Sequence, residues 1–130
     1  MKNKTGGLIE RKLSRKEFYD SFIRLLEANY SEDRQLTNSE REVLVEFMAL
    51  AHEDLKYRYN ILGNISKTKV AAKLKINKPN LEFRLHGIRK KGYLTKDADN
   101  IESLDNVLNK VVSTNSLEIT IQYKIEEDGR

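Results

Sequence analysis

Residues 66–94 read SKTKVAAKLKINKPNLEFRLHGIRKKGYL, and this stretch decides the fold. Its first part predicts a short helix, TKVAAKLK (68–75), with Ser66 as its N-cap. Three apolar residues of this helix share one face and are expected to be buried: Val70, Ala71 and Leu74. A tight turn, Lys75-Ile76-Asn77, then leads to a second helix.

The second helix is expected to open at Pro79 and to run to about Lys91. A residue before proline favours extended backbone and proline suits the first helical position, so Lys78 marks the boundary. Because lysine is a poor cap, we expect Asn77 to share the capping. The buried face carries Leu81, Leu85 and Ile88, and Gly92 ends the helix as a C-terminal glycine should. The whole stretch predicts a helix-turn-helix.

Charge is distributed unevenly, although the formal net charge is only +4. Residues 66–96 contain ten Lys and Arg against Glu82 alone, which makes a local charge of +9. Residues 1–65 are neutral, and residues 97–130 carry −5. This concentration of positive charge favours a polyanionic partner. The alternative is a solvated lysine-rich face that serves solubility.

Two further helices are expected before residue 57. Ser14-Arg15-Lys16-Glu17 and Thr37-Asn38-Ser39-Glu40 both fit a capping box, in which a hydroxyl and a carboxylate satisfy free N–H groups. Behind the first box, one helix face carries Phe18, Phe22, Leu25, Leu26 and Tyr30. Behind the second, a helix over roughly 38–55 carries Val43, Leu44, Phe47, Met48, Ala51 and Leu55.

Strands are expected in the rest of the chain, together with one more helix. Tyr57, Tyr59 and Ile61 alternate and favour a short strand. Residues 93–95 favour another, followed by a turn at 97–100, and the spacing of Ile101, Leu104, Leu108 and Val111 predicts a helix. Residues 117–125 alternate strictly between apolar and polar, which predicts a strand that pairs with 93–96, with 57–62 as a candidate third strand.

The composition excludes several classes of protein. A chain of 130 residues suits one domain, expected over 14–130 behind a flexible arm at 1–13. With no Cys and two isolated His we expect no disulfide, no metal and no cofactor. No apolar run approaches the roughly 18 residues of a membrane span and the N-terminus lacks an apolar signal stretch, so we expect a cytoplasmic protein without a membrane partner. Without a Gly-rich phosphate loop, a nucleophile elbow or paired catalytic carboxylates, we do not expect an enzyme.

Residues 36–96 resemble the winged-helix DNA-binding domains, a superfamily of helix-turn-helix proteins. The pattern of this superfamily has an Ala in the first helix and an apolar residue in the turn. In the second helix, apolar residues at fixed spacings precede a Gly. The matching residues here are Ala71, Leu74, Ile76, Leu81, Leu85, Ile88, Gly92 and Leu94. The resemblance implies a mostly helical α+β domain, a winged helix-turn-helix with an extra N-terminal helix and a C-terminal helix-strand extension.

Two features depart from the winged-helix pattern. Lys75 stands where glycine is usual in the turn, so the turn geometry is expected to be met differently. The usual wing is a short hairpin, but about twenty residues with an expected helix separate Leu94 from Leu117. An ordinary minor-groove wing is therefore not expected.

Charge and resemblance together predict binding of double-stranded DNA. The N-terminal residues of a recognition helix lie nearest the base edges, where Asn can pair with adenine and Arg or Lys with guanine. The base-reading candidates are Asn77, Lys78, Asn80 and Arg84. The phosphate-contact candidates are Lys67, Lys69, Lys73, Lys75, Arg89, Lys90 and Lys91. With six of these engaged, affinity should fall with salt at a log–log slope of roughly −5.

The function expected first is that of a small transcriptional regulator, of bacterial or phage type, with helix 79–91 in the major groove. The alternative is a winged-helix interaction or structural module, such as a phage virion or assembly protein, with non-specific DNA binding or none. Glu82 and Phe83 favour this alternative slightly. In a DNA-binding helix, Glu can accept from cytosine and Phe can touch a thymine methyl. The plainer interpretation is that Glu82 is a solvated charge and that Phe83 is a partner-facing or half-buried aromatic.

Other partners are also open. RNA binding through the same basic face is a third option. Segments 14–30 and 97–130 are candidate surfaces for a homodimer or for another protein partner. Gly87, in the middle of the reading helix, indicates close packing at that point.

Overall fold

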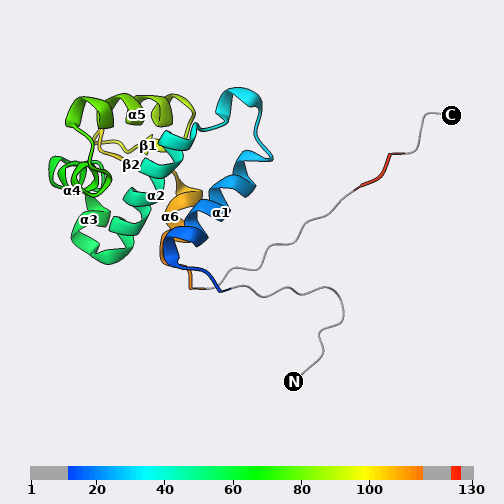
Figure 1. The fold of residues 1–130 in the computed structure, drawn as a ribbon, viewed down its shortest axis with the longest axis horizontal. Helices are drawn as coiled ribbons and strands as arrows, with labels where there is room; N and C mark the ends of the chain where they lie inside the picture. Colours follow the sequence, from blue (N-terminus) through cyan, green and yellow to red (C-terminus); the bar gives the residue numbers. More distant parts are fainter. Residues whose placement is uncertain (1–11, 116–123, 127–130) are drawn as a thin grey trace, which may run out of the picture.

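The computed structural model describes residues 12–115 and 124–126 (Figure 1). The elements in chain order are α1 (Arg15–Glu27), a 3-10 helix (Glu32–Arg34), α2 (Asn38–Glu53), α3 (Leu55–Tyr59), α4 (Asn64–Leu74), α5 (Lys78–Lys90), β1 (Leu94–Lys96), β2 (Glu102–Leu104) and α6 (Asn106–Val112). The described part is mostly helical with one small antiparallel sheet, so the expected α+β class is confirmed at that level. The expected arm 1–13 and the expected strand 117–125 lie, except for residues 12, 13, 124 and 125, outside the described ranges.

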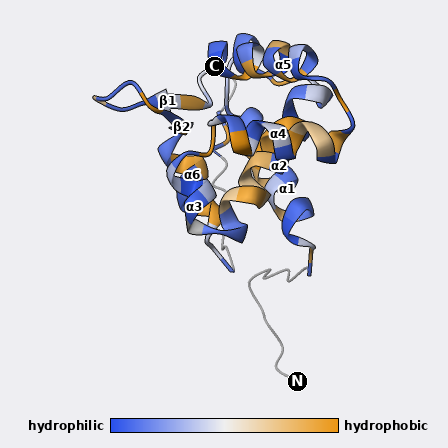
Figure 2. Cartoon of the chain, turned by 90° about the vertical axis from the view of Figure 1, so that its left-hand side faces the viewer, coloured by the Kyte–Doolittle hydropathy of each residue, from blue (hydrophilic) through white to orange (hydrophobic). Residues whose placement is uncertain are grey.

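Helix α2 is the centre of the fold and contacts α1, α3, α4, α5 and α6. Both predicted capping boxes are present, at Ser14 and Glu17 and at Thr37 and Glu40. The predicted stripe on α2 is buried from Val43 through Ala51, and the apolar residues of the other helices gather around it (Figure 2). The helix ends at Glu53 rather than at 55, because Asp54 is extended and caps α3 instead.

The buried face of α1 is shifted by one position along the sequence from the predicted face. Tyr19 and Ile23 are fully buried, whereas Leu25 is 38% exposed, and Phe18, Phe22, Leu26 and Tyr30 only border the core. The hydroxyl of Tyr19 donates to the carbonyl of Val112, 2.6 Å away at the end of α6. This contact joins residues 93 positions apart, so no local sequence pattern encodes it.

The strand expected over 57–62 is wrong. Residues 55–59 form the short helix α3, with the Asp54 side chain accepting from the backbone N–H of Lys56. Tyr57 and Ile61 are both buried, and a spacing of four residues serves a helical turn as well as an alternating strand. The prediction that Ser66 caps α4 is also wrong, because the helix begins at Asn64 with Gly63 as its N-cap. The buried Ser66 hydroxyl instead donates to the carbonyl of Asn60.

The turn between α4 and α5 is tight, as predicted. Lys75 adopts the left-handed conformation, with φ 58°, that glycine usually supplies at this position. The turn is therefore closed without glycine, by a lysine that adopts the left-handed conformation itself. Asn77 is the N-cap of α5 and accepts from Asn80 N–H, so Lys78 is the first helical residue and Pro79 the second.

A β-hairpin follows α5 directly. Gly92, with φ 89°, ends the helix, and β1 then pairs with β2 in the register Leu94–Leu104, Thr95–Ser103 and Lys96–Glu102. The helix expected from Ile101 onward is wrong for residues 101–104, since Glu102–Leu104 form strand β2. The helical part of this segment is α6, which begins at Asn106 with Asp105 as its N-cap. The hairpin projects from the helical body (Figure 2). None of the helices in the described ranges is long and apolar enough to cross a membrane.

Candidate nucleic-acid interface

Helix α5 packs one face into the core and leaves the other outside. Leu81, Leu85 and Ile88 are buried, as predicted, and α5 contacts α2 and α4 on this side. Gly87 is explained by a close approach: a Cβ there would lie 2.0 Å from a carboxylate oxygen of Glu40. The predicted close packing at Gly87 is confirmed.

Three of the four base-reading candidates already have partners within the protein. Asn77 caps α5 with its side chain. The side-chain oxygen of Asn80 accepts from Nε of Arg84 at 3.0 Å, and Nη1 of Arg84 lies 3.4 Å from Glu42 on α2. Lys78 is exposed and forms no ion pair with any described residue.

Three of the seven phosphate-contact candidates are held in ion pairs. Lys67 lies 3.0 Å from Glu82, and Lys91 lies 2.6 Å from Glu40. Arg89 donates two hydrogen bonds to Glu102 of β2, at 2.5 and 2.9 Å. The +9 counted along the sequence is therefore reduced at the surface by carboxylates from α2, α5 and the hairpin.

The remaining phosphate candidates are available to a polyanion. Lys73, Lys75 and Lys90 are exposed and, like Lys78, have no acidic partner among residues 12–115 and 124–126. Lys69 lies over the ring of Tyr57, with its ammonium 5.5 Å from the ring centroid. The unpaired lysines lie near the end of α4, in the turn and at both ends of α5, and Lys73 also lines a pocket with Lys16 and Glu46 of α1 and α2.

The hairpin brings negative charge to the other side of α5. The guanidinium of Arg89 hydrogen-bonds Glu102 and lowers the pKa of that carboxyl below its ordinary value of 4.5. At the hairpin loop, Asp97 accepts from the N–H groups of Asp99 and Ile101, and Asn100 has φ 67°. The loop therefore presents Asp97 and Asp99, and no Lys or Arg, between the two strands.

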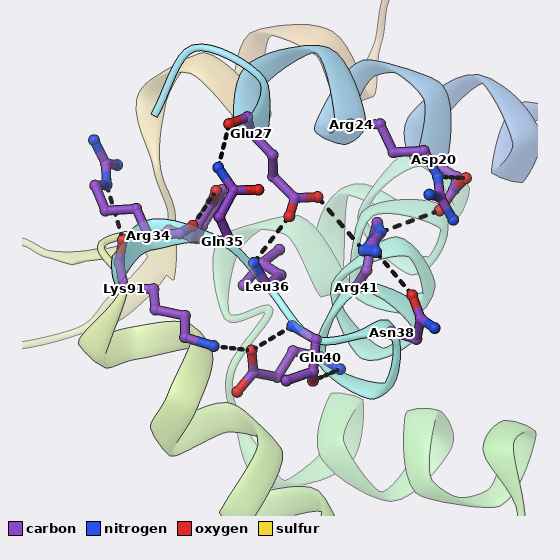
Figure 3. A network of polar contacts seen from close by, with 12 residues as sticks. Asp20, Arg24, Glu27, Arg34, Gln35, Leu36, Asn38, Glu40, Arg41 and Lys91 are labelled. Carbon is purple, nitrogen blue, oxygen red and sulfur yellow. Dashed lines mark hydrogen bonds and ion pairs between the residues drawn. The ribbon is translucent and has the colours of Figure 1, made fainter. Parts of the chain in front are cut away.

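The sequence reasoning left the environment of Phe83 open, as partner-facing or half-buried, and it missed an ion-pair network. Phe83 is 78% exposed and lies opposite the buried face of α5. A helical wheel of α5 would have found this, because Phe83 lies two residues from both Leu81 and Leu85. A buried ion-pair network at the start of α2 was also missed, and no periodic signal marks it (Figure 3).

Arg41 and Glu27 form the centre of that network. The Glu27 carboxylate accepts from the N–H of Leu36 at 2.9 Å and lies 3.5 Å from Nη1 of Arg41. Nη2 of Arg41 donates to Asn38, and its Nε lies 3.8 Å from Asp20. Figure 3 shows Glu40 and Lys91 joining the same region. The network holds α1 and the loop before α2 in place, and α2 in turn supports α5.

The described ranges contain no group of three or more His, Cys, Asp or Glu side chains that could hold a metal ion. Comparisons of the chain with protein families, with curated proteins and with solved structures found no match. The candidate site therefore rests on its own geometry and charge.

Proposed function

We propose that this protein binds double-stranded DNA, with α5 in the major groove, as a small transcriptional regulator. The observation that carries the proposal is the charge of the helix-turn-helix: Lys73 on α4, Lys75 in the turn, and Lys78 and Lys90 at the two ends of α5 are exposed and have no acidic partner in the described chain. Such lysines can neutralise phosphates beside a groove that α5 enters.

The arrangement of elements supports a winged-helix assignment. In that assignment α2, α4 and α5 are the three helices, and the hairpin β1–β2 occupies the position of the wing. The departure lies in the hairpin loop, where Asp97 and Asp99 would repel phosphates. DNA contact is therefore assigned to α4, the turn and α5, and not to a wing inserted in the minor groove.

A salt series tests the proposal. Affinity for a random duplex is measured from low to high salt for the wild type, for Lys78→Glu/Lys90→Glu, and for Lys110→Glu as a control on the exposed surface of α6. With four phosphates neutralised, the wild-type log–log slope should be about −4, and the double variant should lower its magnitude by about 2. The control should keep the wild-type slope.

Two results of the salt series would contradict the proposal. If the wild-type protein showed no salt-dependent affinity for any duplex, DNA binding would be excluded. Equal slopes for the two charge variants would exclude α5 as the contact. Selection from a random-sequence duplex library then separates a regulator, which enriches one motif, from a protein that binds all duplexes alike.

A protein-interaction module is the second candidate function. It is favoured by the ion pairs that neutralise Lys67, Arg84, Arg89 and Lys91, and by two exposed apolar side chains near the helix-turn-helix, Tyr59 and Ile65. Under this candidate the salt series shows no duplex binding.

A further inference from the structure

Phe83 is the most outward-facing apolar side chain of α5. One residue of an α-helix advances by about 100° around the axis, so a residue two positions from Leu81 and from Leu85 lies on the opposite side of the helix. The exposed fraction of Phe83, 78%, agrees with this position, whereas both leucines are buried. The apolar side chain that α5 presents outward is therefore an aromatic ring.

The surroundings of this ring suit a polyanion. Residues three, four and seven positions away on this side of α5 are uncharged or basic, namely Pro79, Asn80, His86, Gly87 and Lys90, and the Glu40 carboxylate that lies over Gly87 is paired with Lys91. The neighbouring acid, Glu82, is paired with Lys67. A protein partner with an acidic surface would meet the same lysines, but a ring between unpaired lysines also matches a groove with phosphates at both edges.

Three of the four base-reading candidates are less free to read bases than Lys78, which is exposed and forms no ion pair with a described residue. Arg84 is tied to Asn80 and Glu42, and Asn77 is the cap. Each would have to give up an intramolecular partner to reach a base edge, which costs part of the gain. Phe83 has no hydrogen bond to break.

We infer that Phe83 is a specificity-determining residue for DNA, and that it contacts the C5-methyl group of thymine in the major groove. That methyl is the apolar group that base pairs display there, and phenylalanine is among the side chains that contact it. The inference rests on the proposed DNA binding and adds the feature that the protein would recognise: thymine methyl groups between neutralised phosphates.

Deoxyuridine provides the test, because it pairs like thymine but lacks the methyl. The affinity of the full chain is measured for an AT-rich duplex and for the same duplex with every thymine replaced by deoxyuridine. Loss of one buried methyl contact should weaken wild-type binding about fourfold. Phe83→Ala should bind both duplexes equally, and Phe83→Leu, which keeps an apolar side chain, should retain part of the discrimination.

The variants are expected to fold, because Phe83 contributes little to the core; circular dichroism and a thermal melt verify this. Equal wild-type affinity for the two duplexes would overturn the inference while leaving DNA binding intact. Discrimination that persists in Phe83→Ala would overturn it as well. Absence of binding to either duplex would instead remove the proposed function, so the two failures are distinct.

Discussion

Lys75 occupies a backbone conformation that lysine rarely adopts, between the two helices of the candidate DNA-binding unit. The left-handed region costs a side chain with a Cβ roughly 1–2 kcal/mol, and glycine avoids this cost but gains freedom in the unfolded chain. Lys75→Gly should therefore raise the free energy of unfolding by about 0.5–1 kcal/mol. Urea unfolding at neutral pH measures it.

Lys75→Ala is the control for loss of the lysine side chain, since alanine keeps the strain and should bring no gain. Glycine and alanine variants of equal stability would contradict the assignment of strain to this residue. Lys75→Gly should also weaken duplex binding slightly, because one unpaired lysine is removed.

Glu27 and Arg41 are buried charged residues whose stability effect is expected to be coupled. Both are at least nine-tenths buried, and the Glu27 carboxylate also accepts from the N–H of Leu36. Removal of one partner leaves an uncompensated charge, so Glu27→Leu should cost about 3 kcal/mol of unfolding free energy. The double variant Glu27→Leu/Arg41→Leu should cost clearly less than the two single variants together.

A double-mutant cycle in urea measures this coupling. The interaction energy should exceed about 1 kcal/mol. Additive effects, within about 0.5 kcal/mol, would show that the two residues act independently.

At the scale of elements, the Arg89–Glu102 pair joins α5 to the hairpin. Because the folded pKa of Glu102 lies below 4.5, this carboxylate contributes stability above its unfolded pKa, and the contribution is lost as pH falls through the folded pKa. Glu102→Gln should therefore lower the unfolding free energy by about 1 kcal/mol at pH 7 and by almost nothing near pH 2.

Unfolding curves at the two pH values verify this, with Glu32→Gln on the exposed 3-10 helix as the control, for which a much smaller pH-dependent difference is expected. A stability difference for Glu102→Gln that does not change with pH would exclude the ion pair as its cause.

The hairpin also explains why the helix predicted from Ile101 onward is wrong for residues 101–104. Residues 101–111 carry apolar side chains at spacings that fit a helix, yet Leu104 lies opposite Leu94 in a strand. Strand β1 needs a partner for its backbone N–H and C=O groups, and residues 102–104 are the first ones able to fold back onto it. Asp105 then caps α6, so the helical part of the pattern begins two residues after the strand ends.

At the scale of the whole molecule, the charge balance of the helix-turn-helix is set by carboxylates from several elements. Glu42 of α2 and Glu82 of α5 neutralise Arg84 and Lys67. Glu42→Gln/Glu82→Gln should free both cations, raise the affinity for duplex DNA and steepen the salt slope by about 2. Titration of a labelled duplex at several salt concentrations measures both effects.

Glu32→Gln removes the same kind of charge from an exposed residue that forms no ion pair with the described part of α4 or α5, and it serves as the matched control for that experiment. An unchanged slope in the double variant would show that Arg84 and Lys67 do not reach the phosphates even when they are free.

Local sequence was sufficient for some parts of this protein. Both capping boxes, the buried residues of α5, the tight turn and the end of α5 at Gly92 follow from interactions within a few residues, so they could be predicted. The candidate base-reading and phosphate residues were also correctly placed on α4, the turn and α5, although their role in DNA binding stays a prediction.

Other features depend on residues far apart in the chain, and only the tertiary structure decides them. Which strand pairs with β1, which face of α1 is buried, and which lysines remain unpaired all depend on contacts across 6 to 93 residues. A count along the sequence sums charges without regard to distance, whereas ion pairs form only between side chains that folding brings within a few ångströms. The outward position of Phe83, by contrast, follows from the helical spacing of α5, once the face with Leu81 and Leu85 is buried.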